Sequence, residues 1–463
     1  MTTHDEDQTL DLLGVGIGPF NLSLAALADR LPRLRTAFVE RGTSFQWHPG
    51  MMIEASTLQV PFLADLVTLV DPTSPWSFLN YMHARERLFP FYFAERFHIH
   101  RAEYDAYCRW VSEQLPSCRF GHVVDTVRWN HARGAFEADL SRVRVDGGVE
   151  RAGRLFARHL ALGVGTAPHV PDSLRPLAED AAVPVWHSAD YLPHREDLLA
   201  AGHVTVVGSG QSGAEVFLDL LRNRPVGRER LTWVARTAAF APMEYSKLGL
   251  EQFTPDYTHY FYGLAEPVRD QLVPRQWQLY KGISADTLGD IQDELYRHSL
   301  DGSWPDVTLT PGIEVRSVRR MAGRLELRVE HTQQSADANL ATDAVVLATG
   351  YAERSIEALI EPLTPHLVRD VAGRLEIDEE YRLVMDEEIG GSVFVQSAGL
   401  HTHGVGSPDL GLAAWRSAVI LNALTGECVY PLPRRTAFTT FGLEGMRRSR
   451  CQSAVPSAGV HTR

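Results

Sequence analysis

The chain has 463 residues, of which 44% are hydrophobic and 22% are charged, as in ordinary soluble globular proteins with two or three domains. A formal net charge of −13 argues against a nucleic-acid-binding protein. The chain has no signal-peptide pattern and no apolar run of about 18 residues, so we expect a cytoplasmic protein that does not span a membrane.

The N-terminal part alternates between strand and helix patterns. A βαβ unit is predicted over 10–40, where LDLLGVG is a strand, NLSLAALADRL a helix and TAFVE the next strand. Helices are predicted over 76–88 and 101–115, and the segments HVVDTVRW and RHLALGVG read as strands. This first unit is predicted to cover residues 9–175.

A second βαβ unit begins at HVTVVGSG, after a linker-like segment. We predict a second domain over 185–340, interrupted by an aromatic-rich helical segment over about 237–305. From ATDAVVLATGY the chain is expected to return to the first domain, over 341–432, and to end there in a helix over 409–424. Residues 433–463 are basic and serine-bearing, and we expect them to form a disordered tail.

A glycine turn follows the first strand, in the segment GVGIGPFN. Glycines here would allow the tight turn and close backbone approach that a dinucleotide pyrophosphate needs at a helix N-terminus. The acidic residue that ends the second strand has the spacing expected of a ligand for ribose hydroxyls. A plain strand-to-helix turn is the alternative interpretation. The candidate residues are Gly14, Gly16, Gly18, Pro19, Asn21 and Glu40.

A second glycine turn, GSGQSG, follows the strand HVTVV. The next strand ends in Arg236 instead of an acidic residue, and an arginine suits the 2′-phosphate of NADPH better than the ribose of NAD. Lys281 would add positive charge, and a solvated strand end is the alternative for Arg236. Two such turns predict two dinucleotides and electron transfer from a nicotinamide to a flavin.

With these motifs the chain resembles the flavin-dependent N-hydroxylating monooxygenases of siderophore biosynthesis, which include lysine N6- and ornithine N5-hydroxylases. The resemblance runs from Leu10 to Pro431 and is closest to the cadaverine hydroxylases of desferrioxamine pathways. It rests on GVGIGPFNLS, FQWHPGM, LQVPFLADL, DPTSPWSFLNY, GSGQSGAE, LATGY and HTHGVGSPDLGLAAWRS, in family order.

The resemblance implies an α/β protein with two Rossmann-like domains, one for FAD and one for NADPH, and a small helical substrate segment. It implies that reduced FAD captures O₂ as a C4a-hydroperoxide, which a neutral primary amine attacks, so no catalytic acid or base is assigned. For FAD it implies Gly14, Gly16, Gly18, Pro19, Asn21, Glu40, Trp47, His48, Gln59 (against the flavin), Val124, Asp409 and Leu410. For NADPH it implies Gly208, Ser209, Gly210, Gln211, Ser212 and Arg236, to which the charge of Lys281 is added from the sequence itself.

Three positions depart from the amino-acid hydroxylases that the chain resembles. Ala64, Leu250 and Gly411 stand where those enzymes have a lysine, an asparagine and a serine that hold the polar end of the substrate. A buried carboxylate without a cation would be costly, whereas apolar walls suit the methylenes of a diamine. We therefore expect cadaverine, or putrescine, as substrate, with L-lysine N6-hydroxylation as the alternative. A different two-dinucleotide oxidoreductase is the more distant alternative.

The second ammonium of a diamine must still be neutralised or hydrated. The sequence offers Glu244, Glu251 and Asp65 as nearby carboxylates without ranking them, and Glu251 is taken as a substrate residue. The histidines of HTHG are interpreted as structural, and no metal is expected. The family resemblance implies a homo-oligomer, a dimer or a tetramer.

Overall fold

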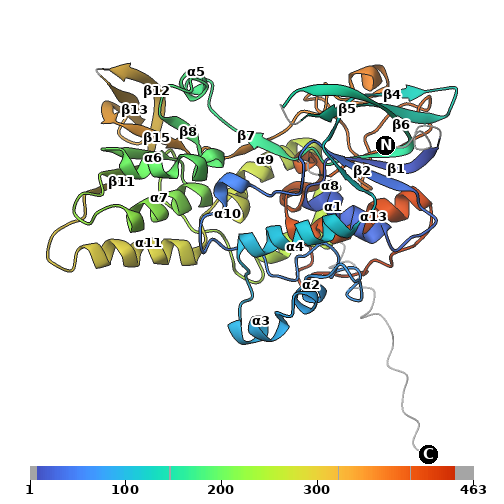
Figure 1. Cartoon of the computed structure of the whole chain (residues 1–463), viewed down its shortest axis with the longest axis horizontal. Coiled ribbons are helices and arrows are strands. Elements are labelled where there is room, and N and C mark those ends of the chain that lie inside the picture. The colour runs from blue at the N-terminus through green and yellow to red at the C-terminus, as the bar shows by residue number, and fades with distance from the viewer. Residues whose placement is uncertain (1–7, 145–146, 322, 397, 444–463) are drawn as a thin grey trace, which may run out of the picture.

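The computed structural model describes residues 8–144, 147–321, 323–396 and 398–443. It consists of two lobes, each built on its own sheet (Figure 1). Two short antiparallel strands, β7 (Thr166–Pro168) and β16 (Tyr351–Glu353), carry the chain from the first lobe to the second and back.

The first lobe is built on a seven-stranded sheet, in which β3, β2, β1, β6 and β17 are parallel to one another. The antiparallel strands β5 and β4 continue the sheet beyond β6. The strands are β1 (Thr9–Val15), β2 (Thr36–Glu40), β3 (Cys118–Phe120), β4 (His122–Asn130), β5 (Ala135–Val143), β6 (Val149–Leu162) and β17 (Val393–Val395).

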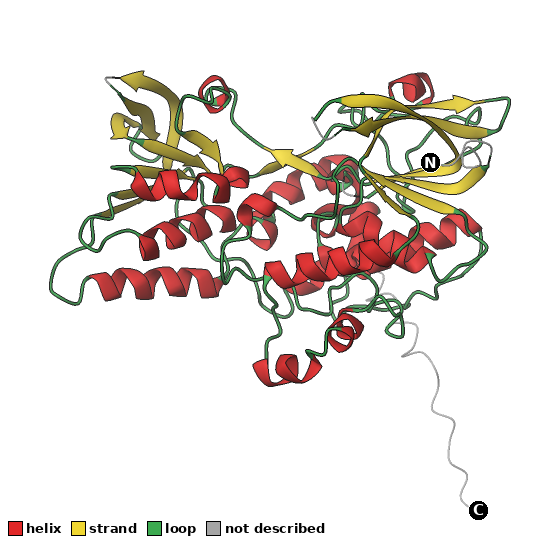
Figure 2. Cartoon of the chain, viewed as in Figure 1, coloured by secondary structure: helices red, strands yellow, loops and turns green. Residues whose placement is uncertain are grey.

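Helices cover one face of this sheet (Figure 2). The helix α1 (Pro19–Ala28) is buried along nearly its whole length, because α13 (Ala413–Thr425) and α4 (Arg101–Gln114) pack against it. Short helices α2 (Phe78–Ala84) and α3 (Leu88–Ala94) follow one another beside α4. The C-terminal helix thus returns to the start of the chain and fixes the glycine turn that precedes α1.

The second lobe has a fully parallel sheet in the order β11-β10-β9-β15-β8. Its strands are β8 (Val185–His187), β9 (Val204–Val207), β10 (Leu231–Ala235), β11 (Val307–Pro311) and β15 (Ala344–Leu347). The central strand β9 has the sequence VTVV and is buried throughout, as expected of a parallel strand covered on both faces. One face packs on α7 (Gln211–Asn223), and α11 (Ala285–His298) packs on α7 in turn.

The remaining elements complete the two lobes. The antiparallel sheet of β12 (Ile313–Met321), β13 (Arg324–His331) and β14 (Ala336–Thr342) covers the other face of the second lobe. The other helices are α5 (Arg175–Ala178), α6 (Arg195–Ala200), α8 (Pro255–Tyr262), α9 (Glu266–Arg275), α10 (Trp277–Tyr280) and α12 (Leu400–His403). The 3-10 helices are η1 (Pro49–Met51), η2 (Ser188–Asp190), η3 (Leu192–His194), η4 (Leu250–Phe253), η5 (Glu361–His366), η6 (Gly404–Gly406) and η7 (Leu410–Leu412).

The predicted fold class, α/β with two dinucleotide-type domains, is confirmed, but two boundaries differ from those expected. The LATGY strand, expected to return to the first domain from residue 341, is β15 and pairs with β9 and β8 of the second lobe, so the return begins at β16. Helix α11, expected within the inserted segment 237–305, belongs to the core of the second lobe. The insert proper is the helical stretch before it, where α8 and α9 pack against α12.

The expected disordered tail differs as well. Between residues 433 and 443 the chain packs against α8, because Phe441 contacts Tyr257 and Tyr260, and the backbone amides of Thr436 and Ala437 donate to Asp256. Residues 444–463 lie outside the described residues.

Candidate functional site

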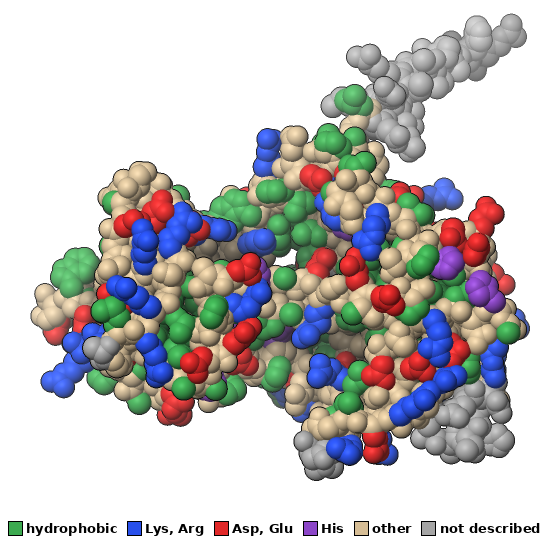
Figure 3. Space-filling model, turned by 90° about the horizontal axis from the view of Figure 1, so that it is seen from above, with side chains coloured by type: hydrophobic (Ala, Val, Ile, Leu, Met, Phe, Trp, Pro, Cys, Tyr) green, Lys and Arg blue, Asp and Glu red, His purple; other side chains and the backbone are tan. Residues whose placement is uncertain are grey.

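A large cavity of about 3390 Å³ lies between the two lobes and reaches both glycine turns. The molecule is visibly hollowed there when seen from above (Figure 3). The carboxyl ends of the parallel strands β1 and β9 both point to this cavity, which is the usual place for a ligand in an open α/β sheet.

The first glycine turn places the N-terminus of α1 at the cavity. Gly16 has φ +88°, and a Cβ there would lie 2.4 Å from the carbonyl oxygen of Gly163, so only glycine fits. Gly18 caps α1 in extended conformation with no atom within 4 Å of a Cβ, and Pro19 fills the first helical position. Unpaired N–H groups of the first turn therefore face open space that suits a pyrophosphate.

Two predicted residues of this turn have internal roles. Gly14 lies inside β1, outside the cavity, where a Cβ would come within 2.0 Å of the Phe38 ring. The lack of a side chain at Gly14 therefore lets β1 pack against the Phe38 ring, and it does not serve contact with a phosphate. Asn21 donates from Nδ2 to the carbonyl oxygens of Val15, Gly16 and Ala161, which ties α1 to β1 and β6.

Glu40 lies at the end of β2 and lines the cavity, as its spacing predicts. Its Oε2 accepts from the backbone amide of Ile17 at 3.0 Å and its Oε1 from that of Gly42 at 2.8 Å. Each carboxylate oxygen keeps acceptor capacity beyond this one bond, so a pair of ribose hydroxyls could bind. Val124, on the edge strand β4, lines the same part of the cavity.

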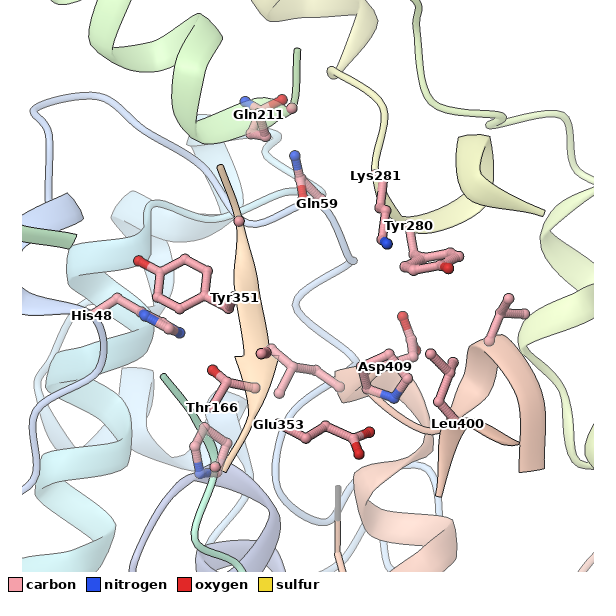
Figure 4. Close-up of a pocket in the computed structure, with 18 of the residues that line it drawn as sticks. His48, Gln59, Thr166, Gln211, Tyr280, Lys281, Tyr351, Glu353, Leu400 and Asp409 are labelled. Atoms are coloured by element: carbon pink, nitrogen blue, oxygen red, sulfur yellow. The ribbon is translucent and has the colours of Figure 1, made fainter. Parts of the chain in front are cut away.

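Trp47, His48 and Gln59 line the middle of the cavity (Figure 4 labels the last two). Burial, and secondarily the charge of Arg101, lower the pKa of His48 to about 4, so its imidazole is neutral at ordinary pH. The Gln59 Nε2 and the Tyr351 hydroxyl are buried without a hydrogen-bond partner among the described residues. Such orphaned polar atoms are rare, and their presence here fits a bound polar group in this place.

The second glycine turn, like the first, has a glycine with positive φ packed against a backbone carbonyl. Gly208 has φ +133°, and a Cβ there would lie 2.1 Å from the carbonyl oxygen of Ala348. Ser209, Gly210 and Ser212 line the cavity at the N-terminus of α7.

Gln211, which also lines the cavity, has a side chain that is already committed to protein partners. Its Nε2 donates to Glu215 at 2.8 Å and to Thr287 at 2.9 Å, and its Oε1 accepts from the amide of Ser284 at 2.7 Å. A cofactor contact by Gln211 would therefore come from its backbone amide and not from its side chain.

Arg236 and Lys281 both line the cavity, as predicted, and both are exposed to it. Among the described residues no hydrogen bond or ion pair engages the Arg236 guanidinium, which leaves it available for an anionic group. Lys281 lies above its neighbour Tyr280, with Nζ 5.2 Å from the ring centre. Figure 4 shows this pair on the same side of the cavity as Asp409.

Sequence reasoning missed an ion pair between the lobes. Arg101, at the start of α4, donates to both carboxylate oxygens of Glu215 on α7, at 2.7 and 2.6 Å. The two side chains are only 14% and 7% exposed. This pair connects the first lobe to the second glycine turn through Gln211, and no local motif signals it because its members are 114 residues apart.

Residues of the connecting strand β16 were also missed. Tyr351 packs edge-on against His48 and His187, and Glu353 projects into the cavity two residues later (Figure 4). Burial raises the pKa of Glu353 to about 7. The signal in the sequence is that Tyr351 ends the LATGY motif and Glu353 follows it by two positions.

The three positions that depart from the amino-acid hydroxylases all face the cavity, and two of them are neighbours. Ala64, Leu250 and Gly411 all line it, and a Cβ built on Gly411 would lie 4.0 Å from the Cβ of Ala64. Asp409 and Leu410 line the same wall at the turn that precedes α13.

The carboxylates proposed from sequence lie elsewhere. Glu251, expected to touch substrate, lies outside the cavity lining and accepts from the backbone amides of Phe438 and Thr439. Asp65 is buried and accepts from the amides of Val67, Thr68 and Phe78 and the Thr68 hydroxyl. Glu244, also outside the lining, accepts from the Ser246 amide.

Within the described ranges no cluster of three or more His, Cys, Asp and Glu residues is arranged to hold a metal ion. His403 of the HTHG segment stacks on Tyr381, and burial lowers its pKa to about 3. No helix in the described part of the chain is long and apolar enough to cross a membrane.

Comparisons with known proteins agree with this geometry. Residues 8–353 match the family model described as L-lysine 6-monooxygenase/L-ornithine 5-monooxygenase. The chain is 40% identical over 444 residues to a putrescine N-hydroxylase of Shewanella oneidensis, covering 95% of this chain and 86% of that one. It is 42% identical over 441 residues to the rhizobactin siderophore biosynthesis protein RhbE of Rhizobium meliloti, covering 94% and 95%.

The solved structures include the FAD-bound cadaverine monooxygenase DfoA of the desferrioxamine pathway from Erwinia amylovora. It superposes with a TM-score of 0.87 at 37% identity, covering 94% of this chain and 99% of that one.

Proposed function

Because the chain belongs to the L-lysine 6-monooxygenase/L-ornithine 5-monooxygenase family, we propose that it N-hydroxylates a primary amine of an aliphatic diamine. Cadaverine is the favoured substrate and putrescine the next, and the hydroxylamine product would serve hydroxamate siderophore biosynthesis. The enzyme is an FAD- and NADPH-dependent monooxygenase, as its family membership and its two glycine turns support.

The first glycine turn would hold FAD. The open N-terminus of α1 at Gly18 suits the pyrophosphate, and Glu40 suits the ribose hydroxyls. The second glycine turn would hold NADPH, with Arg236 on the 2′-phosphate. When bound, FAD that has been reduced by NADPH supplies the activated oxygen atom from O₂.

The chain's own residues bind, orient and exclude water. Neutral His48, the orphaned Gln59 amide and the Tyr351 hydroxyl provide polar contacts in the middle of the cavity without a fixed charge. The reacting amine must be neutral to act as a nucleophile, and no side chain is assigned as its base.

The observation that carries the diamine proposal is the apolar substrate end. Ala64, Leu250 and Gly411 replace the three polar groups with which the amino-acid hydroxylases hold the carboxylate end of their substrate. A substrate carboxylate placed there would lose hydration without gaining a cation, which is strongly unfavourable. A polymethylene chain gains from contact with such walls.

The test is NADPH oxidation by the FAD-loaded enzyme with cadaverine, putrescine, L-lysine and L-ornithine in parallel, scored by hydroxylamine formed. We expect product from the diamines and little from the amino acids. Product from L-lysine but not from diamines would overturn the proposal in favour of lysine N6-hydroxylation.

A variant refines the same test. Ala64→Lys alone is expected not to confer lysine turnover, because Leu250 and Gly411 still withhold the other two polar contacts. Efficient lysine hydroxylation by this single variant would show that one residue decides the substrate.

A cytoplasmic location and a homo-oligomeric state, dimer or tetramer, remain part of the proposal. Light scattering on the purified chain checks the second.

A further inference from the structure

The second ammonium of a diamine must be neutralised or hydrated, and the three carboxylates expected from sequence are committed elsewhere. Asp65 is saturated by four hydrogen bonds from its own loop and α2. Glu251 holds the backbone of residues 438 and 439, and Glu244 holds Ser246. If the protein neutralises this ammonium, a different acidic residue that lines the cavity must do so.

Asp409 lies in the right place. It precedes the 3-10 turn η7 and lines the cavity together with Ala64 and Gly411. Its Oδ1 accepts from the amide of Gly411 at 2.8 Å, and among the described residues no hydrogen bond reaches Oδ2. One oxygen therefore fixes the carboxylate while the other remains free to accept from a ligand.

Gly411 and Asp409 depend on each other. A Cβ at position 411 would lie 2.7 Å from Oδ1 of Asp409, closer than two such atoms can approach. A serine at 411, as in the amino-acid hydroxylases, would therefore displace this carboxylate. The glycine removes a polar contact, and it also makes room for a negative charge next to Ala64.

Among the described residues, no ion pair engages Asp409. The positive charge of Arg416 acts on its carboxylate and works against the rise in its pKa, while the Arg416 guanidinium itself donates to the carbonyl oxygens of Gly406 and Ser407 and lies over the rings of Phe20 and Tyr381. Burial, followed by the charges of Asp286 and Asp409, raises the pKa of the Tyr245 phenol to about 12. The Asp409 carboxylate thus has no direct ion-pair partner among the described residues, and the ammonium of a ligand could take that place.

We propose that Asp409 is the specificity-determining residue that binds the non-reacting ammonium of the diamine through Oδ2, with Ala64 and Gly411 providing the space. This inference rests on the proposed function and assigns a substrate role to a residue that the family resemblance placed at the flavin. The acidic group and the two small residues together replace the contacts that an amino-acid substrate would need.

The test compares Asp409→Asn with the wild-type enzyme on cadaverine and on 1-aminopentane, a monoamine of the same chain length. The amide oxygen can still accept from the Gly411 amide, so the turn is preserved. We expect KM for cadaverine to rise about 100-fold, as for loss of a buried charge-assisted hydrogen bond, and KM for 1-aminopentane to rise far less, with FAD still bound. Calorimetry on enzyme loaded with FAD and NADP⁺ should show the same loss of cadaverine affinity without turnover.

Glu244→Gln is the matched control, since it removes one negative charge on a nearby segment outside the cavity lining. It should leave both substrates unaffected. Unchanged cadaverine binding in Asp409→Asn would overturn the inference and leave the proposed function intact. Equal losses for both amines, or loss of FAD, would also overturn it by assigning Asp409 a structural or flavin role. Wild-type turnover of L-lysine and not diamines would instead overturn the proposed function.

Discussion

The two glycine turns and the substrate end of the same cavity are built in different ways. Each glycine turn is a local structure, in which a buried strand, a glycine with positive φ and a helix N-terminus occur within about ten consecutive residues. The substrate end combines the loop at Ala64, the 3-10 helix at Leu250 and the turn at Gly411, which lie far apart in the chain.

The difference has a physical consequence. At the glycine turns the backbone N–H groups would contact the cofactor, so the space and the dihedral angle at each position determine which residue fits. At the substrate end the side chains carry the chemistry, so that one residue can be exchanged if another compensates. Changes at the turns should therefore prevent or weaken cofactor binding, whereas changes at the substrate end should alter the selectivity for the amine substrate.

The largest effect is expected for Gly16→Ala. The added Cβ would lie 2.4 Å from the Gly163 carbonyl oxygen at φ +88°, a conformation that alanine rarely adopts. We expect a loss of about 3 kcal/mol or more of folding free energy and a purified protein largely without flavin. Flavin absorbance per chain and thermal unfolding measure both.

Gly18→Ala is the matched control in the same turn, because its backbone is extended and nothing lies within 4 Å of the new Cβ. It should unfold at nearly the wild-type temperature. If both variants unfolded alike, the fit of the backbone at Gly16 would not be what the turn depends on.

Arg101→Ala tests how far the second glycine turn depends on its ion pair with the first lobe. It would leave Glu215 buried without its cation, at a cost of about 3–5 kcal/mol. Because Glu215 also holds Gln211, we expect KM for NADPH to rise. Chemical unfolding and NADPH titration give the two quantities.

Arg222→Ala provides the comparison, because Arg222 lies on α7, as Glu215 does. Its partner Asp290 is exposed, and such pairs contribute about 1 kcal/mol or less to stability. If Arg101→Ala lost as little free energy of unfolding as Arg222→Ala, the pair between the lobes would stabilise the protein no more than an exposed pair does.

A smaller effect on binding is expected for Arg236→Ala. Its guanidinium is free among the described residues, so the variant should raise KM for NADPH by about 10- to 100-fold and leave KM for NADH nearly unchanged. Lys281→Ala should act in the same direction but less, since an ammonium cannot form a bidentate contact. An undiminished preference for NADPH in Arg236→Ala would assign the 2′-phosphate to another residue.

Sequence reasoning predicted the two-lobed α/β fold and placed both glycine turns at the cavity, because these features depend on neighbouring residues. It did not predict that Gly14 packs against Phe38 or that the Gln211 side chain bonds to Ser284 and Thr287, since these neighbours come together only through the fold. It missed the Arg101–Glu215 pair for the same reason. It noticed three absent polar groups at the substrate end, but not that Gly411 gives Asp409 its space.

The pH dependence of selectivity gives the finest test of the substrate end. Burial raises the pKa of Asp409 to about 6, so that its carboxylate is charged above this pH and becomes neutral below it. The reacting amine must lose a proton whether the substrate is cadaverine or 1-aminopentane, and this requirement cancels in the ratio of their kcat/KM values. The ratio should be constant between about pH 7 and 8 and fall toward tenfold per pH unit below about pH 6, because only the diamine needs the Asp409 charge. In Asp409→Asn the ratio should be low and independent of pH, and a wild-type ratio that stays flat down to pH 5 would contradict an ionised Asp409 as the ammonium ligand.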